Sequence, residues 1–214
     1  MMVRLYHFIF MLLAFTSLSG CGDFLSDLNF GDTDPIISDH EFPPELVKSI
    51  SEGNETQTDP TTFRQAQYTL GSSSHLLIQA NNLGEKFADV YINEKSRAYF
   101  VVSLPSIEAN PLLEKISLCP LERPWMMLAT WNAAHPFDST GRWSTPGGDY
   151  AQSDCLNPEK NAADLSFDIS DWVQHNVVTR DLSYGLILRS EEPLTIIGDA
   201  TTSKPPRFKW KEVH

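Results

Sequence analysis

RAYFVV, at residues 97–102, decides the fold class of this chain. β-Branched and aromatic residues dominate the stretch, and Pro105 ends it shortly afterwards, which is the pattern of a strand rather than a helix. Similar runs occur at 184–189, 194–197 and 207–213, with turn residues between them. About nine such short strands predict an antiparallel β-sandwich or barrel.

One segment breaks this β pattern. Ser170 can cap a helix, Asp171 favours its first turn, and Trp172, Val173 and Val177 fall near one face. The sequence therefore predicts a single short helix that closes one mouth of the sandwich, with Trp172 packed in the core. The remaining expected strands lie at 76–78, 87–92, 113–118, 125–131 and 165–168.

A short apolar segment opens the chain and ends in Leu18-Ser19-Gly20-Cys21, with Arg4 as its positive start. This is the layout of a secretory signal, and it is too short for a stable transmembrane helix. The ending resembles the lipobox of bacterial lipoproteins, which implies cleavage before Cys21 and lipidation of its sulfur. An ordinary signal peptide with an incidental cysteine is the alternative.

Lipidation would make the membrane a partner of this chain through several acyl chains at Cys21, because together these hold a protein on a bilayer persistently. Gly22 follows the cysteine where some sorting systems read an aspartate as a retention signal. The resemblance to lipoproteins therefore implies an anchor in the outer membrane.

The acidic residues are unevenly distributed. Residues 22–62 hold ten acids and one base, and four prolines interrupt them. Such a segment favours a disordered tether over 21–62, with at most a short helix at 45–50, between a signal at 1–20 and a domain at 63–214. The net charge of −12 argues against nucleic acid as a partner.

The other two cysteines form an even pair in an exported chain, which predicts a disulfide between Cys119 and Cys155. On the chain-entropy model, closing this loop contributes roughly 4 kcal/mol. Two buried free thiols are the alternative. Neither cysteine has the spacing of a zinc site.

Six segments, taken in order, resemble motifs of the DNRLRE family, among them Thr130-Trp131-Asn132 and Tyr184-Gly185-Leu186. The resemblance covers about 63–214 and implies a jelly-roll β-sandwich akin to carbohydrate-binding modules. Residues 63–90 match poorly, and no catalytic domain accompanies the expected sandwich. The six segments are 98–105, 129–132, 143–150, 167–174, 184–188 and 205–210.

Aromatic residues in the loop region 120–160 are the candidate ligand contacts. Sugar rings offer C–H faces and hydroxyl rims, which suit flat aromatic faces with polar neighbours. Trp125, Trp143 and Tyr150 are the expected binding residues. The alternative is that Trp131 and Trp143 are packed in the core.

Three aspartates in the same loops, Asp138, Asp149 and Asp154, are candidate calcium ligands, because calcium prefers oxygen. Their spacing matches no EF-hand, and solvated loop acids are the alternative. Motifs for a serine hydrolase, a zinc protease or a phosphate loop are missing from the sequence, and His135 has no obvious nucleophile as partner. We therefore expect no enzymatic activity.

These features predict a lipid-anchored protein of the bacterial cell envelope whose jelly-roll domain binds a polysaccharide without catalysis. The alternative is a structural or adhesive envelope protein that contacts other surface proteins.

Overall fold

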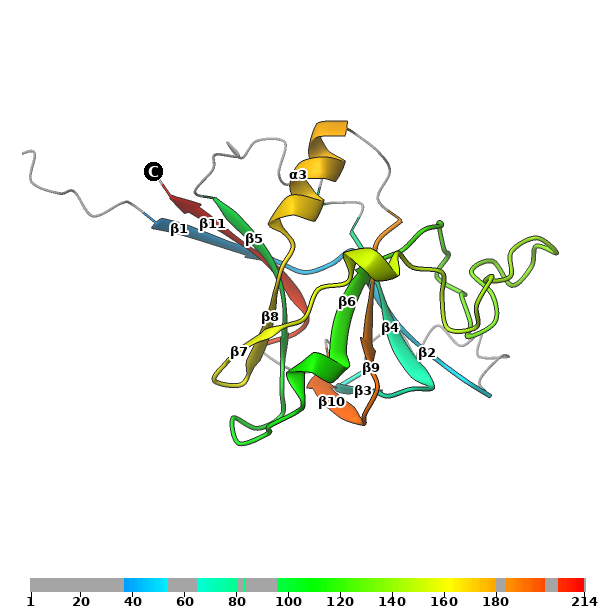
Figure 1. The fold of residues 1–214 in the computed structure, drawn as a ribbon, viewed down its shortest axis with the longest axis horizontal. Coiled ribbons are helices and arrows are strands. Elements are labelled where there is room, and N and C mark those ends of the chain that lie inside the picture. The colour runs from blue at the N-terminus through cyan, green and yellow to red at the C-terminus, as the bar shows by residue number, and fades with distance from the viewer. Residues whose placement is uncertain are drawn as a thin grey trace, which may run out of the picture. The chain divides into compact units, whose positions relative to one another are not determined.

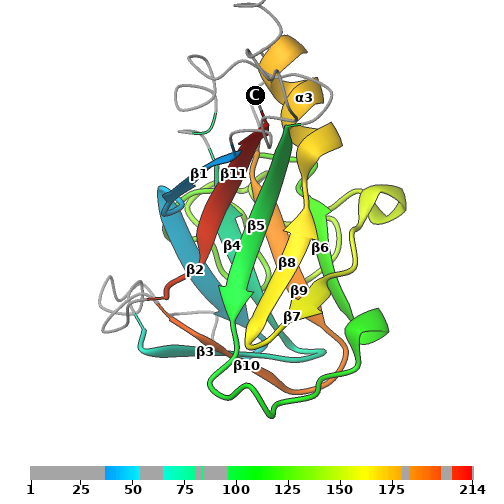
Figure 2. The same cartoon turned by 90° about the vertical axis from the view of Figure 1, so that its left-hand side faces the viewer.

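A computed structural model describes residues 37–53, 65–80, 83, 96–179, 184–198 and 204–213. These residues form an antiparallel β-sandwich with one α-helix, which confirms the predicted fold class. Figure 2 looks onto the first sheet, with the second sheet behind it. In strand order, the first sheet contains β1 (Ile37–Phe42), β11 (Arg207–Val213), β5 (Arg97–Ser103), β8 (Asp164–Asp168) and β7 (Glu159–Asn161).

The second sheet has four strands, and a two-stranded ribbon lies at the end of the sandwich opposite the helix (Figure 1). Two short 3₁₀ turns, η2 (Leu113–Lys115) and η3 (Gln152–Asp154), lie in the connections. The second sheet contains β2 (Leu46–Ser51), β4 (Ser74–Gln79), β9 (Leu186–Ser190) and β6 (Ile116–Pro120), and the ribbon pairs β10 (Leu194–Ile197) with β3 (Gln67–Leu70).

Alternating residues of facing strands fill the space between the two sheets. Ala98, Phe100 and Val102 of β5 are fully buried, and Phe100 lies 5.3 Å from Phe208 and 6.4 Å from Phe167 between ring centroids. Successive side chains of a strand point to opposite faces, so this period-two pattern supplies the main core.

The second sheet is buried on both faces. Leu77, Cys119 and Ile187 point away from the main core, yet each is fully buried. A long connection, residues 121–155, covers them; we call it the loop cover, and Figure 1 shows it in green to yellow on the outer side of the second sheet. This explains why β4 and β9 read as uninterrupted apolar triplets rather than as alternating strands.

The predicted tether is wrong over residues 37–51, because β1 and β2 occupy them and the compact unit begins at Ile37, not at residue 63. Residues 46–51 form a strand, and not the short helix that the sequence allowed at 45–50. Val47 and Ile50 bury their side chains in it.

Ion pairs explain why an acidic segment adds a strand to the sheet. β1 pairs with β11, whose bases face the acids of β1. Lys209 lies 3.1 Å from Asp39 and 3.6 Å from Glu41, and Arg207 lies 3.4 Å from Glu41, between the charged atoms. Two of the acids that favoured an extended tether, Asp39 and Glu41, are therefore neutralised by the last strand of the chain.

The helix α3 (Ser170–Thr179) begins where the sequence predicts it. Its start is held by Asp168, whose Oδ1 accepts a hydrogen bond from the Ser170 amide at 3.0 Å, and by the Ile169 carbonyl, which accepts from Val173. Trp172 is half-buried against the main core.

Other predicted elements have mixed outcomes. The strand expected at 125–131 is wrong, because these residues form turns of the loop cover. The strand expected at 87–92, the signal at 1–20 and Cys21 lie outside the described residues. Within the described part of the chain, no helix has the length and apolarity needed to cross a membrane.

Candidate functional site

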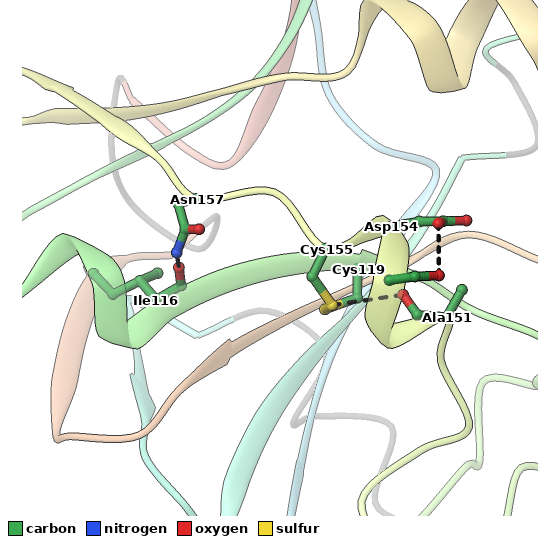
Figure 3. The surroundings of a disulfide bond; sticks show 7 residues. Ile116, Cys119, Ala151, Asp154, Cys155 and Asn157 are labelled. Atoms are coloured by element: carbon green, nitrogen blue, oxygen red, sulfur yellow. Dashed lines mark hydrogen bonds between the residues drawn. A yellow bond between two sulfur atoms is a disulfide. The ribbon is translucent and has the colours of Figure 1, made fainter.

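A disulfide joins Cys119 of β6 to Cys155, which confirms the predicted pairing (Figure 3). Beside it, Leu156 exchanges backbone hydrogen bonds with Leu118, and the Asn157 amide donates to the Ile116 carbonyl at 2.9 Å. The disulfide and these bonds fasten the end of the loop cover to the second sheet.

The tryptophans of the loop cover form a second hydrophobic core. Trp125, Trp131 and Trp143 are only 7, 8 and 5% exposed, and the Trp143 indole donates to the Thr130 carbonyl at 2.9 Å. This burial contradicts the role predicted for Trp125 and Trp143, because neither ring offers an open face to a sugar. The alternative reading, that Trp131 and Trp143 pack in a core, is the one that the structure bears out.

Tyr150 and Asp149 do lie together, at a polar cavity of about 580 Å³ on the loop cover. Tyr150 is half-buried, and the Arg189 guanidinium lies over its ring at 4.4 Å from the centroid. The other residues that line this loop cavity are Glu122, Arg123, Ser144, Thr145, Gly148 and Gln152.

The polar groups of the loop cavity mostly hold the loop itself. Asp149 accepts hydrogen bonds from the amides of Ser144 and Thr145, each at 2.9 Å, and lies 3.5 Å from the Arg123 guanidinium. Burial alone would raise the pKa of Asp149, but these hydrogen bonds outweigh it and the pKa is lowered. Arg123 also donates to the carbonyls of Thr140 and Arg142.

The three predicted calcium ligands are not brought together. Asp138 accepts from the amide and the hydroxyl of Thr140, and these bonds lower its pKa, while Asp154 accepts from the Ser153 hydroxyl. Over the described residues, no group of three or more His, Cys, Asp or Glu side chains could hold a metal ion. The aspartates act as turn formers, and Asp149 is the one that organises a loop.

A histidine that the sequence reasoning missed lies beneath the loop cover. His75 is 4% exposed, its Nδ1 donates to the Gly147 carbonyl at 2.9 Å, and its ring lies 4.8 Å from that of Trp131. Burial, and to a lesser extent the nearby Arg189, lower the pKa of His75 to about 4. Its place inside the apolar run of β4 was the available signal.

A groove of about 950 Å³ lies at the helix end of the sandwich, and we call it the end groove. Apolar side chains of both sheets and the first turns of α3 enclose it. Its lining comprises Ser96, Arg97, Leu118, Pro120, Asp154, Leu156, Asp168, Ile169, Ser170, Asp171, Trp172, Val173, Gln174, His175, Asn176, Leu186 and Trp210.

The end groove has an apolar side and a polar side. Trp172 supplies a half-buried aromatic ring, and aliphatic residues such as Leu156 and Leu186 extend that surface. Exposed polar side chains from α3, among them Gln174 and His175, border it. Of the predicted site residues, only Asp154 lines the end groove. The sequence predicts Trp172 in the core, and no local pattern indicates a groove beside the helix.

No protein-family model matches the chain, and no curated protein matches it. The resemblance to DNRLRE domains therefore stays a prediction.

Proposed function

We propose that this chain is a lipid-anchored protein of the bacterial cell envelope whose DNRLRE-like jelly roll binds carbohydrate without catalysis. The observation that carries the proposal is the end groove, which combines the Trp172 ring with an apolar wall and a polar border. Sugar rings present both C–H faces and hydroxyl groups, so a ligand of this kind can use both sides of the groove.

The size of the end groove supports a small or chain-like ligand. Its volume of about 950 Å³ lies within the range of roughly 300 to 1,000 Å³ common for ligand sites. Most of the lining comes from strands and from α3, which are more rigid supports than loops. A segment of a polysaccharide is a suitable occupant.

The loop cavity is the weaker candidate for this function. Its carboxylate, Asp149, and its guanidinium, Arg123, already hold the loop together. Tyr150 is its one aromatic residue, and Arg189 covers that ring. A sugar there would have to compete with bonds that maintain the loop.

The anchoring part of the proposal rests on the sequence. The apolar segment before Cys21 resembles a lipoprotein signal, and lipid at this cysteine would tie the sandwich to the outer membrane. The formal net charge of −12 disfavours nucleic acid as a partner.

Glycan arrays probed with residues 22–214 test the binding function, because this span contains the whole sandwich. We expect binding to at least one polysaccharide, and a loss of tenfold or more on Trp172→Ala. Gln174→Ala, at the exposed border, provides a second variant that leaves the core intact. Phe137→Ala is the matched control, since Phe137 is 73% exposed and lines neither cavity.

Absence of binding to every polysaccharide on the array would refute the binding function. Binding that survives both groove variants unchanged would move the site elsewhere on the molecule.

A structural or adhesive role is the second candidate, favoured by apolar side chains exposed on loops. Phe137 is 73% and Ile107 63% exposed, and a protein partner could cover such residues. Cross-linking in cells separates the two functions. A structural role predicts one defined protein partner that persists after enzymatic removal of glycans, whereas the proposed function predicts that removal of glycans abolishes the association.

A further inference from the structure

The end groove is lined by more negative than positive side chains. What we infer from this rests on the function proposed for the groove. Asp154, Asp168 and Asp171 lie in its lining, against one permanently charged base, Arg97. We infer that the end groove selects glycans that bear free amines, and disfavours glycans that bear carboxylates, because Trp172 and the three aspartates line the same cavity.

The aspartates keep oxygen atoms available to a ligand. Asp171 is exposed and makes no hydrogen bond or ion pair with any residue that the structure describes. Over the described residues, the hydrogen bonds of Asp168 and Asp154 use only the Oδ1 atom of each, toward Ser170 and Ser153. Ammonium groups can therefore approach carboxylate oxygens without breaking the fold.

The positive groups at the end groove are fewer or already engaged. The Arg97 guanidinium donates to the Ser96 carbonyl at 2.8 Å. The first turn of α3 would attract an anion, but Asp168 and Asp171 already place negative charge there. An anionic sugar would thus meet repulsion from three carboxylates.

Trp172 adds a second attraction for the same chemistry, independent of the acids. An indole face attracts a cation as well as the C–H groups of a sugar ring. A protonated amino sugar can use both properties at once, whereas a neutral sugar uses only one. The acidic chain as a whole, at −12, also steers cations toward the groove.

Calorimetric titration of the full chain tests this inference, in a detergent with a polyoxyethylene headgroup so that no detergent sugar competes. The probes are oligoglucosamine, its N-acetylated counterpart and an oligouronate, of matched length, at mildly acidic pH and low salt. We expect oligoglucosamine to bind at least tenfold more tightly than the N-acetylated form, and the oligouronate to bind most weakly. Added salt should reduce the preference, since exposed charges are screened.

Asp171→Asn should weaken oligoglucosamine binding about threefold to tenfold and leave the N-acetylated form unchanged, as expected for one exposed charge pair. Glu108→Gln is the matched control, because it removes one exposed negative charge from the loop at the far end of β5. An equal loss with the control would mean that net charge, not the groove, sets the preference.

Equal affinity for the amine and N-acetyl forms would overturn this inference and leave the proposed carbohydrate binding intact. Failure of all three oligosaccharides to bind, together with a negative glycan array, would remove the proposed function itself. A lysine-rich peptide that binds as tightly as oligoglucosamine would also overturn the inference, because the groove would then read charge without reading sugar.

Discussion

One buried residue beneath the loop cover, His75, links the stability of this protein to pH. His75 is neutral in the fold because its Nε2 is buried without a hydrogen-bond partner in the described structure, so protonation there would add an unpaired N–H and a charge. Arg189, on the neighbouring strand β9, would repel that charge. The same burial that stabilises the loop cover near neutral pH therefore opposes it in acid.

The folded pKa of His75 is lowered from 6.5 to about 4, so its neutral form favours folding. This contribution is fully present above pH 6.5 and is lost as the pH falls toward 4, by up to about 3 kcal/mol. Urea unfolding across this pH range should show a smaller loss of stability for His75→Gln, which can still donate to Gly147 but cannot titrate. Parallel pH curves for the two proteins would refute this assignment.

Gly147 is the second residue on which the loop cover depends. Its φ is +93°, and a Cβ would lie 2.8 Å from the Trp131 ring and 3.0 Å from the His75 ring. Gly147→Ala should therefore lower the free energy of unfolding by about 1–3 kcal/mol. Gly71→Ala is the control, since it meets nothing within 4 Å and has no positive φ. Thermal unfolding would contradict the argument if both variants had the same effect.

At the scale of elements, some strands are specified by their own residues, and others depend on residues far away in the sequence. The strands at 194–197 and 207–213 coincide with the sequence prediction, because short apolar runs between turn residues specify them. β1 could not be predicted in this way, since its acids favour a strand only beside Lys209 and Arg207 at the other end of the chain.

The candidate site shows the same limit of sequence reasoning. Trp125 and Trp143 are predicted at a ligand because flat aromatic faces in a loop region suit sugar rings, but the loop cover packs on the outer face of the second sheet. Trp172 was expected in the core because it lies on the apolar face of α3. Its half-exposure depends on where both sheets end, and no local pattern records that position.

Removal of β1 and β2 tests their place in the sandwich. A chain that begins at residue 63 loses one edge strand from each sheet, which exposes Ile78 and Phe208 and leaves two ladders unpaired. We expect it to aggregate, whereas a chain that begins at Ile37 should fold. Circular dichroism and gel filtration measure the difference. Identical melting of both chains would show that the two strands are dispensable.

At the scale of the whole molecule, attachment and folding should be separable. Residues 37–214 form a compact unit distinct from residues 1–36, which include the predicted signal and Cys21. The lipid would therefore determine where the protein is located, and the sandwich would determine which ligand the protein binds.

Cys21→Ser should abolish labelling by a palmitate analogue and partition into detergent, because it removes the predicted acylation site. Cys155→Ser is the control, since it breaks the disulfide but leaves Cys21 in place, and it should still take up label. Label on the Cys21→Ser variant, or its partition into detergent after signal removal, would refute the lipoprotein reading.

The pairing of β1 with β11 also has a mechanical consequence. Tension from a membrane anchor would enter the sandwich at Ile37, which pairs with Val213. Arg97 and Trp210, which line the end groove, lie at this same end of the first sheet. If a ligand bound in the end groove resisted this tension, the force would act on the Ile37–Val213 end of the β1–β11 ladder. The residue pairs of the ladder would then separate one after another. Under load, β1 would separate from β11 at low force, while the rest of the sandwich stayed folded and bound to the ligand.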